Sequence, residues 1–315
     1  MFYRFDVRRP LTLKEASEIL HELGEGALPL AGGTDLMILV KERKVRPKVL
    51  VDLWELRPGL SYAKRGGGVV RIGALTTVKE ICSAPELRDV RYAGFAGLCH
   101  WFATPYIRSL ATIGGNLGTG HSFSDFIPLT LVLDGEVVLH GINGARMVPV
   151  RALYRDKRVL NKSHDEVIKE VIIREPPERS ATVFMKFDRR SEHVYGYVTT
   201  AVYLQLAEND EILDVRIAFD RVTRRHPERA YQTENYLRGK EFSIDLITYA
   251  AREILPKEMR RKSDFRASAE YRLDLSKTLM RRALYLAWAK VVRKPIDIKH
   301  FPITEFLKIP PHKRA

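Results

Sequence analysis

Two short glycine-rich segments constrain this chain more than any other feature of its sequence. They read Ala31-Gly32-Gly33-Thr34-Asp35 and Thr112-Ile113-Gly114-Gly115-Asn116, about 80 residues apart. Consecutive glycines let the backbone approach a ligand closely and turn several N–H groups toward one point, which suits a pyrophosphate. A single Gly-Gly pair is most often a tight turn. Two pairs flanked by Thr and by Asp or Asn leave a ligand loop and a plain turn as equal alternatives.

Neither segment belongs to the commonest nucleotide-binding motifs. No G-x-G-x-x-G follows a strand, so the Rossmann dinucleotide fingerprint is missing, and the phosphate-binding G-x-x-x-x-G-K-[ST] is missing as well.

Helix and strand patterns mix over about the first 175 residues. Thr12 with Glu15 and Thr77 with Glu80 have capping-box spacing, each at the start of a helix. Asn143-Gly144 predicts a hairpin turn. The predicted strands are 28–30, 49–53, 69–72, 136–140 and 146–150.

A different pattern follows the Pro-rich linker at 175–178. Alternating apolar residues predict an antiparallel sheet, and helices follow it. The strands are 182–187, 198–207 and 212–219, and the helices are 228–237, 244–255 and 275–290. We therefore predict an α+β fold. Its parts are a domain at 1–175 (subdomains about 1–57 and 58–175), a domain at 176–290 and an extended tail at 291–315.

The chain has only two cysteines, Cys82 and Cys99. An iron–sulfur centre or a cysteine-rich zinc site needs about four thiolates, so neither is expected in this chain. A disulfide between the two remains open, but in a reducing compartment we expect two buried, inert thiols.

The formal net charge is +14, from 53 Lys and Arg against 39 Asp and Glu. This balance favours an anionic partner. The basic residues are dispersed and lack an aromatic-and-basic module, so we expect no nucleic-acid function. A charged surface with few Gln and Asn is also typical of heat-adapted proteins. No apolar run approaches the roughly 20 residues that span a bilayer. We expect no membrane span and a cytoplasmic location.

Many further motifs occur in a fixed order along the chain. They are Arg9-Pro10, Leu30 to Leu36, Val51-Asp52-Leu53, Ile72 to Thr77, Ile107-Arg108, Ala111 to Asn116, Ser124-Asp125, Lys186 with Arg189, Glu234 with Leu237 and Gly239, and Tyr271-Arg272. In this respect the chain resembles the FAD-binding medium subunits of the molybdenum hydroxylases, the group of xanthine dehydrogenase, aldehyde oxidoreductase and aerobic carbon monoxide dehydrogenase. The resemblance extends to about Lys290.

The resemblance implies a fold and a set of cofactor residues. The first domain would have the vanillyl-alcohol oxidase type of FAD-binding fold, and the second the C-terminal fold of the CO dehydrogenase flavoprotein. Ala31 to Asp35 and Thr112 to Asn116 would cradle the FAD pyrophosphate, with glycine N–H groups turned toward it. Asp125 would lie near the ribose and adenine, and Lys186 near the flavin end. A turn-capping Asp125 and a solvated Lys186 are the plainer alternatives.

The resemblance also implies partners. A large subunit would hold the molybdenum cofactor, a small subunit would hold two [2Fe–2S] clusters, and this chain would pass electrons through FAD to an external acceptor. We expect a dimer of heterotrimers. The alternatives are a stand-alone FAD oxidase of the same fold and a basic interaction protein whose glycine segments are only turns.

Two segments depart from the family pattern. Leu117 to Phe123 differs from the usual Ala- and Pro-containing stretch, and Ser191 to Tyr195 replaces a region that borders the flavin edge in relatives. The cysteine-rich loop that holds an extra cluster in 4-hydroxybenzoyl-CoA reductases is missing between Asn116 and Asp125.

Overall fold

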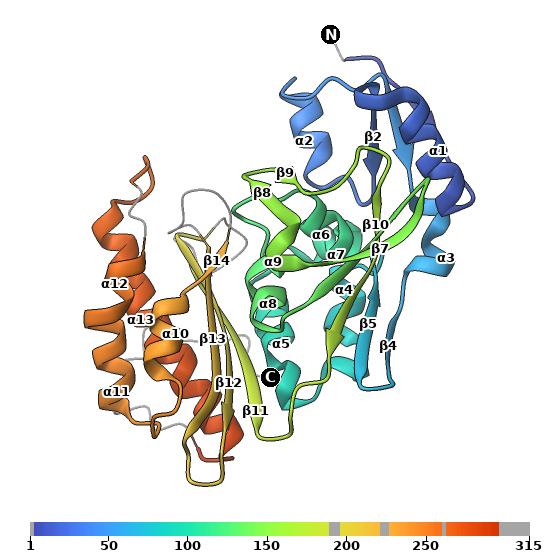
Figure 1. Ribbon diagram of the computed structural model, residues 1–315. Coiled ribbons are helices and arrows are strands. Elements are labelled where there is room, and N and C mark those ends of the chain that lie inside the picture. Colours follow the sequence, from blue (N-terminus) through green and yellow to red (C-terminus); the bar gives the residue numbers. More distant parts are fainter. Residues whose placement is uncertain (1–2, 189–195, 221–226, 260–262, 296–315) are drawn as a thin grey trace.

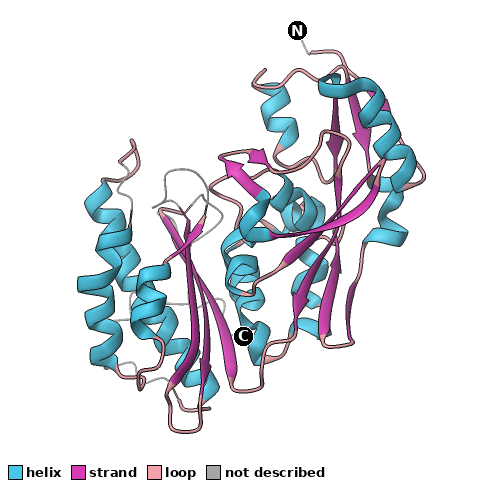
Figure 2. Cartoon of the chain, viewed as in Figure 1, coloured by secondary structure: helices cyan, strands magenta, loops and turns pink. Residues whose placement is uncertain are grey.

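Three main sheets and the helices around them make up the described part of the chain (Figures 1 and 2). The structure is a computed structural model, and it describes residues 3–188, 196–220, 227–259 and 263–295. The predicted departure at Ser191 to Tyr195 and the tail from residue 296 onward therefore lie outside the described residues.

The first sheet is small and parallel, with the strand order β1-β3-β2. Helix α1 packs its Ala16 and Leu20 against Val51 of this sheet. Thr12 caps α1 as predicted, by accepting from the N–H of Glu15, but the Glu15 carboxylate accepts from Leu11 instead of completing the box. The elements are β1 Asp6–Arg8, α1 Leu13–Leu23, β2 Ala27–Leu30, α2 Leu36–Lys41, β3 Val49–Asp52 and α3 Arg57–Leu60.

The second sheet is antiparallel, with the strand order β4-β5-β10-β6-β7. The predicted hairpin is confirmed, since β6 and β7 pair up to Gly141 and Gly144. Strand β10 lies in the middle of the sheet and was not predicted. The strands are β4 Ala63–Gly66, β5 Val69–Gly73, β6 Glu136–Gly141, β7 Gly144–Pro149 and β10 Val167–Arg174.

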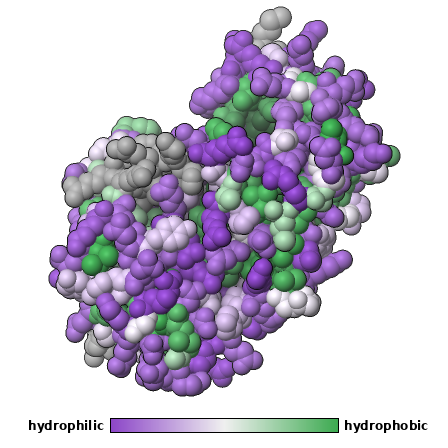
Figure 3. All heavy atoms as spheres, in the orientation of Figure 1, coloured by the Kyte–Doolittle hydropathy of each residue, from purple (hydrophilic) through white to green (hydrophobic). Residues whose placement is uncertain are grey.

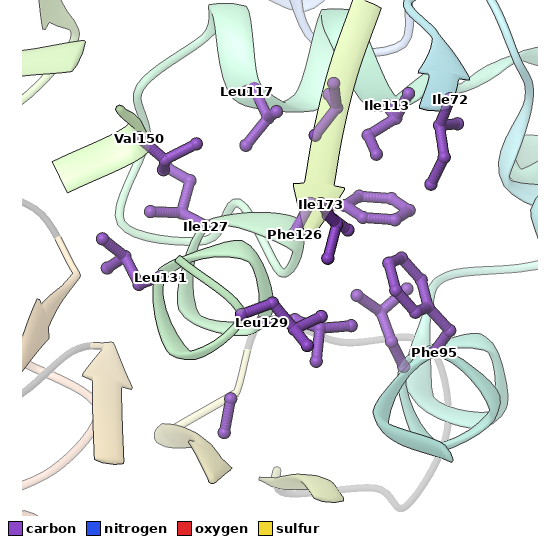
Figure 4. Packing of buried hydrophobic residues seen from close by; sticks show 14 of the residues in the cluster. Ile72, Phe95, Ile113, Leu117, Phe126, Ile127, Leu129, Leu131, Val150 and Ile173 are labelled. Atoms are coloured by element: carbon purple, nitrogen blue, oxygen red, sulfur yellow. The ribbon is translucent and has the colours of Figure 1, made fainter. Parts of the chain in front are cut away.

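Short helices cover the second sheet and bury its core (Figure 4). Phe95, Phe126 and Ile173, which come from three different elements, meet there. The capping box of Thr77 and Glu80 is complete, as predicted. The elements are α4 Val78–Ser83, α5 Ala93–Trp101, α6 Pro105–Leu110, α7 Ile113–Gly118, α8 Phe126–Val132, α9 Val150–Leu153, β8 Tyr154–Asp156 and β9 Val159–Leu160.

The third sheet is antiparallel, as predicted, and lies between two layers of helices (Figure 1). Phe184 and Tyr203 face α5 and α8 within the core of the second sheet, whereas Val183 and Val202 face α10 to α13. The elements are β11 Ser180–Phe187, β12 Val198–Leu206, β13 Ile212–Asp220, β14 Glu228–Arg229, α10 Tyr231–Leu237, α11 Ile244–Tyr249, a π-helical turn Ala250–Ile254, α12 Leu255–Glu258 and α13 Ala269–Val291.

Arginines fasten the predicted linker to the first domain. Arg65 and Arg91 both form ion pairs with Glu175, and the Arg91 guanidinium donates to the carbonyl of Pro176 over 3.0 Å. The domain boundaries themselves stay a prediction.

The prediction of two inert thiols is wrong. Cys82 at the end of α4 and Cys99 near the end of α5 form a disulfide, with 5.7 Å between their Cα atoms. Only Cys99 is buried. The helix packing that brings the two residues together depends on contacts between α4 and α5 that their spacing in the chain does not reveal.

Hydrophilic side chains cover most of the face shown in Figure 3, and apolar ones form small separate patches. None of the helices in the described ranges combines the length and the apolar character that a bilayer crossing requires.

Candidate cofactor site

The first glycine motif forms an open loop between β2 and α2. Gly33 adopts a φ of +68°, a left-handed conformation that favours glycine. The N–H groups of Gly32, Gly33, Thr34 and Asp35 donate no hydrogen bond to any acceptor in the described part of the chain. All four residues are half-buried. The loop thus offers several adjacent N–H groups to an anion, as the sequence predicts.

The two glycine motifs meet in space. A Cβ on Gly32 would lie 1.8 Å from the carbonyl oxygen of Leu110, at the end of α6, so only glycine permits this approach. A Cβ on Gly115 would lie 3.7 Å from the Cβ of Ala31. Residues far apart in the chain therefore form one surface.

The second glycine motif differs from the prediction. It is the start of helix α7, and the N–H groups of Ile113 and Gly114 donate to the carbonyls of Thr76 and Ala74 over 3.1 and 2.9 Å. The N–H of Gly115 donates to Thr112 Oγ1 over 3.0 Å. The expectation that Gly114 and Gly115 turn free N–H groups toward a pyrophosphate is therefore wrong, since these groups are already bonded within the protein.

Close packing explains Gly114 in α7. A Cβ on Gly114 would lie 2.6 Å from the Cβ of Ala74 and 2.7 Å from its carbonyl oxygen. The buried Thr112 caps the helix. The Asn116 side chain accepts from the N–H of Phe126 over 3.1 Å and so joins α7 to the start of α8.

Asp125 and Lys186 lie in direct contact. The Lys186 ammonium donates to both oxygens of the Asp125 carboxylate, over 2.9 and 3.2 Å, and each side chain is 7% exposed. Burial raises the pKa of Asp125, and the charge of Lys186 opposes that shift. The plainer alternative of a solvated Lys186 is wrong. The two residues also mark one place at the junction of the domains, rather than two separate ends of a ligand.

Arg158 was missed by the sequence analysis. Its guanidinium lies 3.8 Å from the carboxylate of Asp35. The backbone N–H of Arg158 donates to the carbonyl of Gly120 over 2.9 Å. The β8–β9 hairpin thereby connects the first motif with the segment that follows the second. No local pattern in the sequence indicates this pairing.

His121 and Phe123 stack in the segment after α7, with 4.4 Å between their ring centroids. The Arg266 guanidinium lies 5.3 Å from the centroid of the Phe123 ring. The end of the segment that departs from the family pattern thus makes ring and cation contacts, in addition to the hydrogen bond at Gly120.

The residues present fit FAD. Unbonded N–H groups in the 31–35 loop suit a diphosphate, and a positive charge and a carboxylate lie at the domain junction. Within the described ranges, no group of three or more His, Cys, Asp or Glu residues is placed to hold a metal ion. The fold and this loop define a protein suited to bind a cofactor that contains a diphosphate.

Comparison with known proteins identifies the family. Residues 3–176 match the family described as FAD binding domain in molybdopterin dehydrogenase, and residues 182–287 match the CO dehydrogenase flavoprotein C-terminal domain. The chain belongs to the FAD-binding medium subunits of the molybdenum hydroxylases and is an oxidoreductase subunit. The predicted family, fold class and FAD cofactor are confirmed.

Relatives match this chain over most of its length. The nicotine 6-hydroxylase medium subunit of Paenarthrobacter nicotinovorans is 30% identical over 89% of this chain and 96% of its own length. The carbon monoxide dehydrogenase medium chain of Hydrogenophaga pseudoflava is 28% identical over 91% of this chain and 98% of its own. A solved structure of carbon monoxide dehydrogenase from the same organism, lacking the Mo-pyranopterin moiety, superposes with a TM-score of 0.86. It is 27% identical and covers 92% of this chain and 99% of the other.

Proposed function

We propose that this chain is the FAD-binding subunit that passes electrons to an external acceptor in a heteromeric molybdenum hydroxylase. A large partner would carry the molybdenum cofactor and oxidise the substrate, and a small partner would carry two [2Fe–2S] clusters. When bound, FAD would supply the redox chemistry, which is the exchange of electrons with the partner's clusters and with an external acceptor. The observation that carries the proposal is the open loop at 31–35, which meets α7 in a chain that matches this family over both domains.

The protein would bind and orient FAD rather than act as an acid or a base. The N–H groups of Gly32 to Asp35 would donate to the diphosphate, and the Thr34 hydroxyl is suited to add a further bond. Asp125 and Lys186 would contact the cofactor from the domain junction. Because the two charges form a buried ion pair, we expect neither side chain to donate or accept a proton during the reaction.

The sequence supports the need for partners. Two cysteines cannot hold a cluster, and both are used in the disulfide. The relatives are named medium chains or medium subunits. We place the complex in the cytoplasm as a dimer of heterotrimers. A disulfide inside the cell is compatible with a heat-adapted source, because intracellular disulfides persist in hyperthermophiles. The charge-rich composition of the chain is typical of heat-adapted proteins as well.

The first experiment is FAD titration of the isolated chain, followed by metal analysis. We expect one FAD, released intact by acid, with neither molybdenum nor stoichiometric iron. A folded protein that stays colourless with added FAD would overturn the proposal.

Co-expression with candidate small and large subunits tests the assembly. We expect a heteromer on size-exclusion chromatography with light scattering, and a variant lacking residues 294–315 that assembles less well but keeps its FAD. A monomer that reduces its acceptor without partners would favour the stand-alone oxidase.

A further inference from the structure

Helix α8 is buried between the two domains. All seven residues from Phe126 to Val132 are buried. The helix contacts β12, β13 and β14 of the third sheet, and its apolar side chains belong to the core cluster that the second sheet and its helices form (Figure 4). Two of the predicted cofactor residues flank its first turn. Asp125 is the residue just before the helix, and the Asn116 side chain accepts from the N–H of Phe126.

The other end of α8 is held by the second domain. The Arg216 guanidinium on β13 donates to the carbonyl of Val132 over 3.1 Å and pairs with Asp134 over 2.8 Å. Arg229 on β14 pairs with the same carboxylate over 3.0 Å. The last carbonyls of a helix lack partners within it and carry partial negative charge, so two cations here are favourable.

These contacts differ from ordinary surface ion pairs, which contribute little. The side chain of Arg229 is only 8% exposed, and Glu234, itself 1% exposed, accepts from it over 2.7 and 2.9 Å. Arg216 is 20% exposed and lies 4.5 Å from the centroid of the Tyr203 ring. Both guanidinium groups are therefore held in place by contacts within the second domain, independently of their contacts at the end of α8.

We propose that Arg216 and Arg229 are positioning residues for the FAD site, acting through α8. The helix is about 10 Å long at 1.5 Å per residue, and it is packed on all sides. Fixing its last turn therefore fixes the place of Asp125 and the support for Asn116 at its first turn. This inference rests on the proposed function.

The test replaces Arg216 by Ala or Lys in the full chain and titrates each variant with FAD. The matched control is Arg179→Ala. Arg179 lies in the same domain and is 33% exposed. It also binds one carbonyl, of Ala207, and two carboxylates, of Glu208 and Asp210, but none of its interactions within the described ranges reaches α8. We expect Arg216→Ala to weaken FAD binding about tenfold and to alter the visible circular dichroism of bound flavin. Arg216→Lys restores much of the affinity, and Arg179→Ala stays within twofold of wild type.

Wild-type affinity and an unchanged flavin spectrum in Arg216→Ala would overturn the inference while leaving the proposed function intact. Equal losses in Arg216→Ala and Arg179→Ala would overturn it as well, because general destabilisation would then explain both. If Arg216→Ala does not fold, Asp134→Asn removes the ion pairs of Arg216 and Arg229 at a residue that is half-exposed. Wild-type affinity in this variant, or a loss equal to that in Arg179→Ala, would overturn the inference in the same way. Absence of FAD binding by the wild type would instead refute the proposed function.

Discussion

Replacing Gly32 by Ala probes the contact between the two glycine motifs. The new Cβ would lie 1.8 Å from the carbonyl oxygen of Leu110 and 2.6 Å from its carbon, whereas ordinary contacts begin near 3.4 Å. The shortfall to the oxygen is about 1.6 Å, and the neighbour is backbone at the end of a helix, so a rotamer change cannot relieve it. Gly32 has no positive φ, so the effect is one of space alone.

Overpacking of this kind costs roughly 1–3 kcal/mol, and a backbone neighbour favours the upper end. If the loop escapes by moving away from α6, the N–H groups of 31–35 leave their place. Since about 1.4 kcal/mol is a tenfold change in affinity, we expect the dissociation constant for FAD to rise between about tenfold and 100-fold.

The assay is FAD titration by flavin fluorescence, with circular dichroism and thermal unfolding to monitor the fold. Gly59→Ala is the matched control, because a Cβ there meets nothing within 4 Å and φ is not positive. We expect Gly59→Ala to bind FAD like wild type. Gly32→Ala with wild-type affinity and wild-type thermal stability would refute the reasoning that the two motifs must touch.

Three further predictions follow from buried or paired groups. Replacing Cys82 and Cys99 by Ala removes a cross-link over 17 residues. The variant should lose about 3 kcal/mol of unfolding free energy, and a dithiol reductant should lower the thermal stability of the wild type alone. Hydrogen bonds from a neighbouring arginine lower the pKa of Asp89 to about 2 from 3.8. Because this folded-state pKa lies below the unfolded value, the stabilisation is present above about pH 4 and is lost as the pH falls toward 2; Asp89→Asn should flatten that part of an acid unfolding curve. Lys186→Met leaves the buried Asp125 carboxylate unpaired and should cost roughly 3–5 kcal/mol in denaturant unfolding, with partial recovery when Asp125→Asn is added.

Local sequence signals predicted the elements that depend on neighbours in the chain. The Thr77 capping box and the Asn143-Gly144 hairpin are examples, since each is decided within a few residues. Helices α5 and α8 escaped because apolar residues surround them, so they show no amphipathic period. Strand β10 escaped because its place in the middle of a sheet depends on partners about 30 and 100 residues away.

The candidate site was predicted in its parts but not in its arrangement. The motif residues come together, yet Gly-Gly-Asn begins a helix capped by Thr112, where the sequence suggested a loop. Without an acidic residue at the third helical position, held by Gly115, that cap has no capping-box signature. The pairs of Asp125 with Lys186 and of Asp35 with Arg158 join segments that only the packed fold brings together.

The sheet from β11 to β14, buried on both faces, has a consequence for synthesis of the chain. A ribosome adds about 5–20 residues per second, so the roughly 50 residues from the linker to β14 take about 3–10 s. During that interval the nascent first domain has no cover for the side of α5 and α8 that Phe184 and Tyr203 will contact. The nascent first domain therefore exposes this apolar surface of α5 and α8 to solvent for several seconds. A chaperone, or strands β11 and β12 once they are synthesised, must cover it before the core is complete.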